Sequence, residues 1–311
     1  MRCNIFSEDN CNMKNAIVLL NGKAGNNFGK RNAFKIIEQI NSEGYETLVV
    51  PVGAECKTDL REILLEHKDN IDVCVSVGGD GTLHHTVNTL LKNSCSLPIV
   101  YLPCGTTNDF ARSLGLIDRV STGGKLIGTD TMKLDAGLFN QEYFTYVAAF
   151  GALTDVSYNT TQEAKNILGY TAYALNSLQS IPSGLSSRIH AKIESKEFSA
   201  EGEYLYGSVS NCYSVAGIQS PLLEDVMLND GLFEVVLIKA PDNAGELFEI
   251  ASTLLSGNID DKNNHHVTMF RTSKVSFAFE DKTEWTLDGE YGGTVKNAAI
   301  SVKKGKIVLL K

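Results

Sequence analysis

Apolar and polar positions follow two different patterns along the chain. In the first part, short apolar runs such as 16–20 and 47–50 alternate with stretches in which apolar residues recur every three or four positions, as at Phe34, Ile37 and Ile40. Short runs of this kind indicate buried strands, and the longer period indicates helices. Their alternation predicts a parallel sheet with helices on its faces.

Beyond about residue 135 the pattern changes to strand-like runs separated by turn residues. We expect strands at 143–149, 187–193, 205–209, 233–238, 267–270, 275–279 and 299–302, with helices at 164–178 and 244–255. This order predicts an antiparallel, β-rich second domain. Residues 1–13 precede the first run and are expected to form a disordered extension.

Composition and charge narrow the function classes. The chain has 311 residues and a formal net charge of −9, which argues against nucleic-acid binding, since clustered lysine and arginine supply affinity for phosphate backbones. No apolar run reaches the roughly 20 residues that a transmembrane helix needs. The seven cysteines show no C-x-x-C spacing, which is typical of reduced thiols in a cytoplasmic protein.

Two turns rich in glycine and small polar residues carry the candidate chemistry. The run 72–77 leads into Gly78-Gly79-Asp80-Gly81-Thr82 and then into helical periodicity, and the run 98–102 leads into a turn at 103–109. Glycines let the backbone approach a ligand closely, and free N–H groups at a helix start bind anions. Because both turns follow strands of one parallel sheet, we expect them to face one crevice and hold a nucleotide phosphate. A structural strand-to-helix connection is the alternative for either turn alone.

Together, Gly-Gly-Asp-Gly-Thr at 78–82 and Gly-Thr-Thr-Asn-Asp-Phe-Ala-Arg at 105–112 resemble the catalytic domain of the diacylglycerol kinase and sphingosine kinase superfamily. The resemblance continues through 133–137, 168–173, 209–211, 228–233 and 287–290, and it is nearest to the soluble bacterial lipid kinases. It implies a two-domain lipid kinase fold with the nucleotide between the domains. The α/β ATP-binding domain would cover 14–134 and a C-terminal strand at about 304–311, and the β-rich antiparallel lipid-binding and catalytic domain would cover 135–303.

The resemblance implies an ATP site made by three turns. Its residues are Asn21, Lys23, Gly25, Gly78, Gly79, Asp80, Gly81, Thr82 and Thr106. Asp80 is best placed there to contact magnesium-bound phosphates, because a hard cation prefers carboxylate oxygen. The first turn lacks Walker A spacing, and His84 stands where a dinucleotide fingerprint needs its third glycine. A flexible surface loop is the alternative for 21–27.

The Asp288-Gly289 pair has two interpretations. Asp-Gly is a strong hairpin-turn signal, which on its own predicts a turn in a β-rich domain. The resemblance instead implies that Asp288 is the general base, accepting a hydrogen bond from the lipid hydroxyl, with Glu290 in a supporting role.

Asn229-Asp230-Gly231 is also a turn signal. Here the resemblance implies a structural magnesium site, formed by the Asp230 carboxylate and the backbone carbonyls of Met227 and Leu232. The histidine pairs at 84–85 and 265–266 do not predict a metal site, since adjacent side chains point to different sides of a helix or strand.

The sequence thus predicts an ATP- and magnesium-dependent lipid kinase with diacylglycerol as the favoured acceptor. Sphingoid bases, monoacylglycerols, phosphatidylglycerol and undecaprenol are alternatives within the same fold. NAD kinase shares the Gly-Gly-Asp-Gly-Thr motif, and a regulator that binds lipid or nucleotide without catalysis is a further alternative. We expect a cytoplasmic protein that docks transiently on the membrane to reach its lipid, with a homodimer as a possible assembly.

Overall fold

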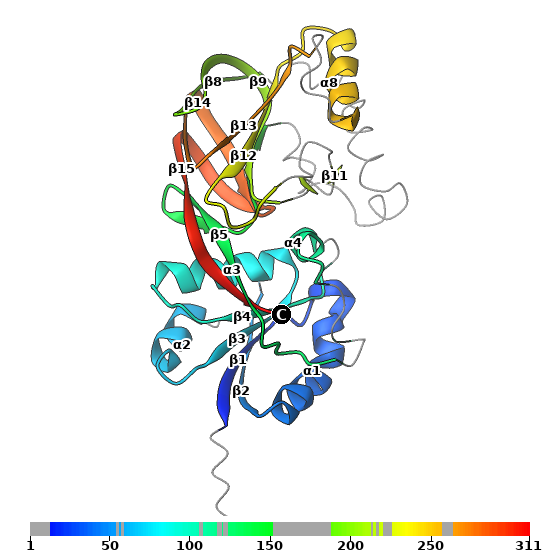
Figure 1. Cartoon of the computed structure of the whole chain (residues 1–311), viewed down its shortest axis with the longest axis vertical. Coiled ribbons are helices and arrows are strands. Elements are labelled where there is room, and N and C mark those ends of the chain that lie inside the picture. Colours follow the sequence, from blue (N-terminus) through cyan, green and yellow to red (C-terminus); the bar gives the residue numbers. More distant parts are fainter. Residues whose placement is uncertain are drawn as a thin grey trace, which may run out of the picture.

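The structure is a computed structural model that describes residues 13–53, 56, 59–105, 108–116, 120, 124–151, 188–212, 214–215, 218–219, 226–256 and 264–311. Two parts lie one above the other along the long axis of the molecule (Figure 1). The lower part contains the N-terminal strands and helices, and the upper part is rich in β-strands. One sheet of 13 strands runs through both parts.

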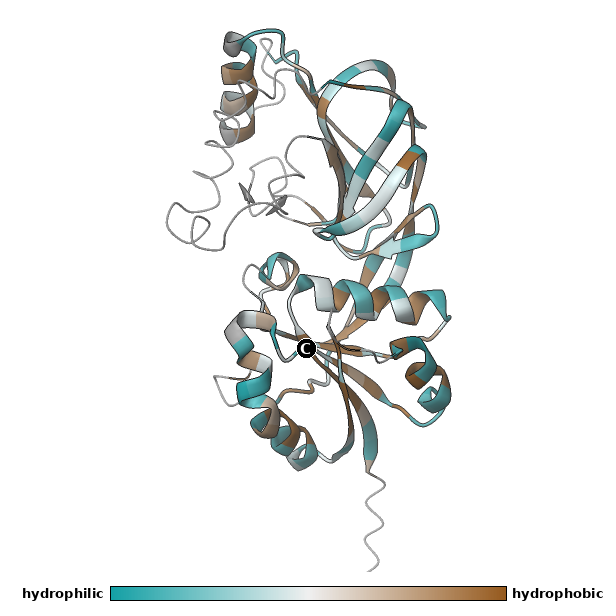
Figure 2. Ribbon diagram, turned by 180° about the vertical axis from the view of Figure 1, so that it is seen from behind, coloured by the Kyte–Doolittle hydropathy of each residue, from teal (hydrophilic) through white to brown (hydrophobic). Residues whose placement is uncertain are grey.

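Four parallel strands form the centre of the lower part. They are β1 (Lys14–Leu20), β2 (Tyr45–Pro51), β3 (Val73–Gly78) and β4 (Ile99–Pro103), in the spatial order β2-β1-β3-β4. Every residue of β3 is buried, as expected for a parallel strand covered on both faces. The strands are apolar and the outer sides of the neighbouring helices are largely polar (Figure 2). The lower part therefore has the architecture that the alternating pattern predicted.

Helices cover both faces of these strands. They are α1 (Ala24–Ser42), α2 (Leu60–His67), α3 (Asp80–Lys92) and the short α4 (Asp109–Ser113). Helix α1 packs Ile36 and Ile40 into the core on one face, and α3 packs Leu83 and Val87 into the core on the other. The expected apolar face of α1 was partly wrong, because Phe34 is 89% exposed and the buried positions are four residues apart at 36 and 40.

Antiparallel strands dominate the upper part. They are β5 (Thr131–Phe139), β6 (Glu142–Phe144), β7 (Val147–Gly151), β8 (Ile189–Ser195), β9 (Ser199–Ser210), β12 (Phe233–Lys239), β13 (Val267–Thr272), β14 (Lys274–Leu287) and β15 (Glu290–Leu310). Helix α8 (Ala244–Ser256) lies at one end, and β10 (Ser214–Val215) pairs with β11 (Ile218–Gln219) as a separate two-stranded sheet. Phe150, Phe277, Phe279 and Trp285 pack together as an aromatic core. The predicted helix at 164–178 lies outside the described residues.

Strand β15 joins the two parts. It pairs with β14 and β5 in antiparallel fashion and reaches β4, where Leu309 lies opposite Ile99 in parallel register. The separate strands expected at 299–302 and 304–311 are therefore one strand, interrupted only by an irregularity between Lys303 and Ile307. The long strand crosses from the upper to the lower part (Figure 1).

The single strand expected at 143–149 was also wrong. It is divided into β6 and β7. The N–H groups of Thr145 and Tyr146 donate to the Asp288 side chain, so they do not pair with a neighbouring strand. This interruption brings the backbone of one strand pair against the candidate active site.

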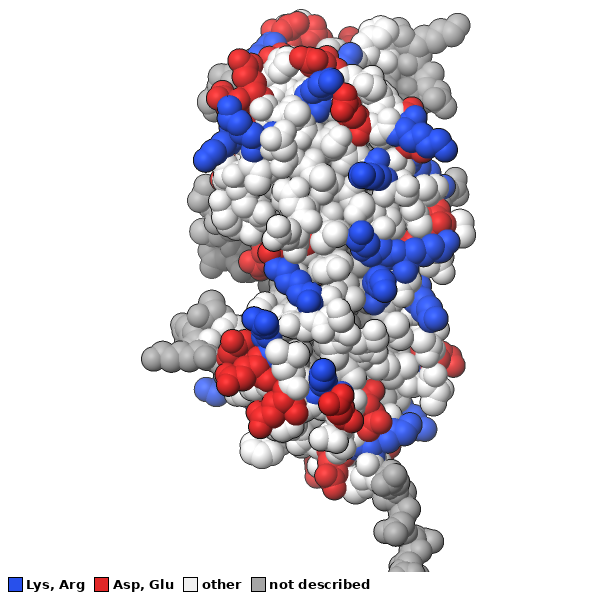
Figure 3. Space-filling view, turned by 90° about the vertical axis from the view of Figure 1, so that its left-hand side faces the viewer, with Lys and Arg blue, Asp and Glu red and all other residues white. Residues whose placement is uncertain are grey.

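Charge is unevenly distributed on the surface. On the side shown in Figure 3, Lys and Arg gather around the middle of the molecule, and Asp and Glu lie mainly towards its two ends. Among the residues that the structure describes, no helix is both long enough and apolar enough to cross a bilayer.

Candidate active site

Three turns meet at the carboxyl ends of β1, β3 and β4. The amide of Asn21, after β1, donates to the Thr82 hydroxyl in the first turn of α3 at 3.0 Å. A Cβ atom on Gly78 would lie 2.3 Å from the same hydroxyl oxygen, so only glycine fits at position 78. The sequence prediction that turns following neighbouring strands lie close together agrees with this geometry.

Two close backbone approaches hold these turns together. A Cβ atom on Gly25 would lie 1.7 Å from the Cys104 carbonyl oxygen, and one on Gly105 would lie 2.6 Å from the Gly79 Cα. Gly25 also has a φ of 54°, a conformation that glycine adopts without strain. Glycine at these positions is therefore required for the turns to touch.

The first predicted turn is shorter than expected. Helix α1 begins at Ala24, directly after Lys23, whose N–H donates to Asn21 Oδ1 at 3.2 Å. The interval 21–27 is thus a tight turn followed by helix, not a flexible loop. Thr106, which the resemblance assigns to the ATP site, lies outside the described residues.

Asp80 is the first residue of α3 and braces the second turn. Its Oδ2 accepts the Asp109 N–H at 2.9 Å, and its Oδ1 accepts the Tyr101 hydroxyl at 3.3 Å. Burial raises the pKa of Asp80 from 3.8 to about 6, and the nearby Asp109 adds to the increase. The Gly79 cap position offers no side-chain hydrogen bond to the helix, so the first turn of α3 presents backbone donors of the kind that bind anions.

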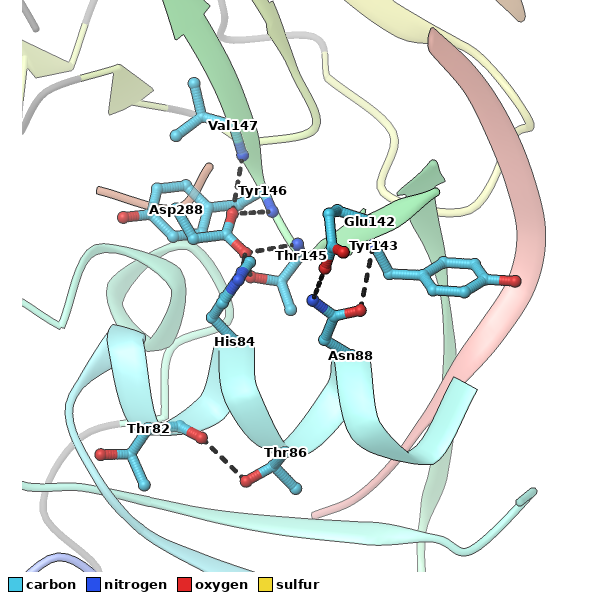
Figure 4. A network of polar contacts seen from close by, with 10 residues as sticks. All are labelled: Thr82, His84, Thr86, Asn88, Glu142, Tyr143, Thr145, Tyr146, Val147 and Asp288. Carbon is cyan, nitrogen blue, oxygen red and sulfur yellow. Dashed lines mark hydrogen bonds and ion pairs between the residues drawn. The ribbon is translucent and has the colours of Figure 1, made fainter. Parts of the chain in front are cut away.

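The Asp288 carboxyl group is buried and surrounded by donors (Figure 4). Oδ2 accepts the N–H and hydroxyl of Thr145 at 2.7 and 2.8 Å, and Oδ1 accepts the N–H groups of Tyr146 and Val147 at 2.8 and 3.1 Å. The His84 ring completes the set, with Nδ1 2.8 Å from Oδ2. Five contacts therefore fix the orientation of this carboxylate.

The structure confirms the hairpin-turn interpretation of Asp288-Gly289. Leu287 pairs with Glu290 across a two-residue connection between β14 and β15, and φ is 53° at Asp288 and 84° at Gly289. Two positive φ values are typical of a type I′ hairpin turn. The hairpin turn directs the Asp288 side chain into the network of Figure 4.

Glu290 extends from the same hairpin towards the glycine turn. A Cβ atom on Gly81 would lie 2.3 Å from Glu290 Oε1, so the carboxylate lies directly against the start of α3. The hairpin of the upper part and the turn of the lower part are thus in contact.

His84 is the site residue that sequence reasoning missed. It lies one helical turn after Asp80 on α3, and its side chain is 13% exposed whereas that of Asp288 is 0% exposed. Burial opposes protonation of the ring, but the hydrogen bond and charge of Asp288, together with Glu290 and Glu142, raise the pKa of His84 overall. The i to i+4 spacing from Asp80 was an available signal that both side chains share one helix face.

Helix α3 also holds the upper part in place further along its length. Asn88 accepts the Tyr143 N–H at 3.2 Å through Oδ1 and donates to Glu142 Oε2 at 2.8 Å through Nδ2. Helix α3 therefore follows the glycine turn directly, contacts Asp288 through His84 in its second turn, and contacts β6 through Asn88 in its third (Figure 4).

The turn at Asp230 does not fit the magnesium site that the resemblance implies. Asp230 Oδ1 accepts the Leu232 N–H at 2.9 Å, and Oδ2 is paired with the Arg271 guanidinium. Lys304 Nζ donates to the Asp230 carbonyl at 3.2 Å. Two cationic side chains already contact this residue, and a divalent ion would be repelled by both. The contacts of Asp230 therefore do not fit the magnesium site implied for Met227, Asp230 and Leu232.

Asp135 joins the Asp230 turn to β15. Its Oδ2 accepts the Gly231 N–H at 2.6 Å, and its Oδ1 accepts the Gly305 N–H at 2.7 Å. The side chain is fully buried. These contacts give Asp135 a structural role at the junction of three segments.

The chain is similar to known proteins over nearly all of its length. A family model described as the diacylglycerol kinase catalytic domain matches residues 15–138. A diacylglycerol kinase of Bacillus subtilis (strain 168) is 30% identical over 295 residues, which is 93% of this chain and 94% of that protein. A diacylglycerol kinase of Staphylococcus saprophyticus is 29% identical and covers 94% of this chain and 93% of its own length.

Solved structures show the same fold. A crystal structure of a diacylglycerol kinase from Bacillus anthracis str. Sterne covers 96% of both chains with a TM-score of 0.70 and 19% identity. A second structure from that organism reaches a TM-score of 0.77 at 22% identity, with the same coverage.

Proposed function

Because the chain belongs to the diacylglycerol kinase family and is a lipid kinase, we propose that it transfers the γ-phosphoryl group of ATP to the hydroxyl group of diacylglycerol. The observation that carries the proposal is the direct link between the two halves of the site. Gly81 at the start of α3 touches Glu290, and His84 in the next turn contacts Asp288. A phosphate held at the helix start would therefore lie beside the hairpin of the upper part.

In this proposal the turns of the lower part bind ATP. The N–H groups in the first turn of α3 and the helix dipole would attract the phosphates, and Asn21, Lys23 and Thr82 would contribute side-chain donors. Magnesium would enter with ATP as part of the substrate, and the carboxylates of Asp80 and Glu290 would face it, since Mg²⁺ prefers oxygen ligands. Glu290 lies against Gly81, the residue that follows Asp80 in the first turn of α3.

Asp288 would lie beside the lipid hydroxyl and the γ-phosphoryl group during transfer. Phosphoryl transfer proceeds through a loose transition state in which positioning and charge stabilisation dominate. A carboxylate fixed by five contacts is suited to that task because it loses little freedom when the substrate arrives. Its replacement is expected to remove transfer even where ATP still binds.

The lipid would be reached from a membrane surface. The basic side chains around the middle of one face support transient docking on anionic lipid (Figure 3). A cytoplasmic location agrees with Cys56, Cys74, Cys95 and Cys104 being free thiols. A homodimer stays a prediction.

The test is transfer of labelled γ-phosphate from ATP with magnesium to an acceptor panel. The panel contains diacylglycerol, monoacylglycerol, sphingosine, phosphatidylglycerol and undecaprenol in mixed micelles, and NAD in solution, with lipid-free micelles as the control for hydrolysis. Labelled phosphatidic acid is the expected product. Preferential labelling of another lipid would correct the acceptor, labelled NADP would replace the lipid assignment, and no labelled product would favour a non-catalytic binding protein.

A further inference from the structure

The His84 side chain lies where the two parts of the molecule meet, and acidic side chains surround it (Figure 4). Its Nδ1 atom is 2.8 Å from Asp288 Oδ2, and the charges of Glu290 and Glu142 also act on the ring. Asp288 and Glu290 come from the β14–β15 hairpin, and Glu142 comes from β6. His85, the next residue of α3, interacts electrostatically with the same ring.

These charges favour the doubly protonated form of the ring. Burial by itself opposes the positive charge of an imidazolium. The hydrogen bond and charge of Asp288, with the charges of Glu290 and Glu142, outweigh burial and raise the pKa of His84 above its usual value of 6.5. Asp288 is stabilised in return, because its side chain is 0% exposed and a buried charge is costly unless it is paired.

The protonated ring has a second donor to offer. An imidazolium carries two N–H groups, and the contact with Asp288 uses only Nδ1. Nε2 lies at the opposite edge of the ring and forms no hydrogen bond to any residue that the structure describes, while the side chain is 13% exposed. The ring is one helical turn from Gly81 at the start of α3. A cationic donor is therefore available beside the turn that would hold the phosphates.

We propose that His84 is a further catalytic residue, which as an imidazolium donates Nε2–H to an oxygen of the transferring γ-phosphoryl group while Nδ1–H orients Asp288. The assignment rests on the proposed lipid kinase reaction. Phosphoryl transfer is accelerated mainly by positioning and by cationic groups that stabilise the charge on the phosphoryl oxygens. One ring would thus fix the carboxylate and the phosphoryl group relative to each other.

The ring keeps both of its protons throughout the step. As the acceptor oxygen forms its bond to the γ-phosphorus, the bond from that phosphorus to the bridging oxygen breaks, and ADP leaves with that electron pair. The hydroxyl proton passes to the Asp288 carboxylate, the general base that the family resemblance implies. The adjacent imidazolium makes Asp288 a weaker base, which a loose transition state tolerates because the proton can leave late.

Substitution of His84 separates its charge from its contact with Asp288. The amide of His84→Asn can replace Nδ1 as donor to Asp288 but carries no positive charge, so we expect kcat to fall by about 100-fold, with the melting temperature unchanged and the Kd for ATP within threefold. His84→Lys keeps a positive charge and should exceed the kcat of His84→Asn at least about threefold. His85→Asn, at an exposed position on the same helix, is the matched control and should keep wild-type kcat.

The pH dependence distinguishes this role from a purely structural one. Because the protonated ring is the active form, wild-type kcat should fall as the pH rises through the pKa of His84, and His84→Asn should lack this alkaline limb. NMR of 13C-labelled histidine reads the same pKa directly, with His84→Asn identifying the signal. Binding of β,γ-methylene-ATP with magnesium should raise that pKa further, since a nearby phosphate stabilises the charged ring.

The outcomes separate the role of His84 from the lipid kinase reaction. Wild-type protein that labels no acceptor in the panel would overturn the reaction and the catalytic role with it. With active wild-type protein, the role of His84 alone would be overturned by a His84→Asn variant within threefold of wild-type kcat, by an alkaline limb that persists in this variant, or by an NMR pKa that the ATP analogue does not raise.

Discussion

Replacing Asp80 by asparagine should make the protein more stable at neutral pH while weakening its activity. Burial of Asp80, together with the neighbouring Asp109, raises its pKa from 3.8 to about 6. The folded state therefore binds a proton up to a higher pH than the unfolded state does. Below pH 3.8 the carboxyl group is protonated in both states and does not change the free energy of unfolding. Between pH 3.8 and about 6 the buried charge lowers this free energy progressively, and above that pH the full loss is present.

The size of the expected stabilisation follows from the shift in the pKa of Asp80. A change of roughly two pKa units corresponds to about 3 kcal/mol of unfolding free energy. The amide of the Asp80→Asn variant would still accept the Asp109 N–H and could donate to Tyr101, so the contacts of Asp80 at 2.9 and 3.3 Å have neutral equivalents. The variant should exceed the wild type by up to about 3 kcal/mol at pH 8, and by only about 1 kcal/mol at pH 4.5.

Urea unfolding at several pH values measures this difference. Far-UV circular dichroism follows the whole chain, and fluorescence of the single tryptophan, buried Trp285, follows the β-rich core. Asp69→Asn, at an exposed position, should change neither signal. The account would be refuted by a variant that is no more stable than the wild type at pH 8, or by one whose gain in unfolding free energy does not depend on pH. Either result would mean that the Asp80 carboxylate is not a buried charge kept, at a cost in stability, for phosphate-bound magnesium.

Three further changes test other parts of the structure. Asp135→Asn should lower the unfolding free energy by about 2–4 kcal/mol, because one of the two N–H groups that donate to this buried side chain loses its acceptor; urea curves that coincide with the wild type would contradict this role. Gly105→Ala should weaken ATP binding at least about tenfold by calorimetry, because its Cβ would lie 2.6 Å from Gly79 Cα; unchanged affinity would show that the two turns do not act together. Chelation of magnesium by EDTA should leave the melting temperature of the nucleotide-free protein unchanged, since Arg271 already pairs with Asp230; a clear decrease would restore the structural metal site.

The local features of the site could be predicted from the sequence. The buried run before Gly78 and the helical period after Thr82 placed the glycine turn at the end of a parallel strand, where the structure has it. Asp288-Gly289 was recognisable as a hairpin turn because two residues with positive φ favour this pair. These features depend on neighbours in the chain, which is the information that hydrophobic periodicity and turn chemistry contain.

The remaining features depend on contacts between distant segments. The His84–Asp288 pair joins positions 204 residues apart, and no local pattern in either segment indicates it. The length of β15 was hidden by the irregularity near Gly305, whose φ is 62°. The Arg271–Asp230 pair replaced an expected metal site with an ion pair, because a strand far along the chain brings a guanidinium to the turn.

The central claim is that Asp288 is required for transfer and not for nucleotide binding. The most direct measurement compares wild-type protein with Asp288→Asn in two assays on the same preparations: transfer of labelled γ-phosphate to diacylglycerol, and ATP affinity by calorimetry. We predict a loss of at least about 100-fold in transfer, with the Kd for ATP within threefold of the wild type. Undiminished transfer by Asp288→Asn would contradict the account.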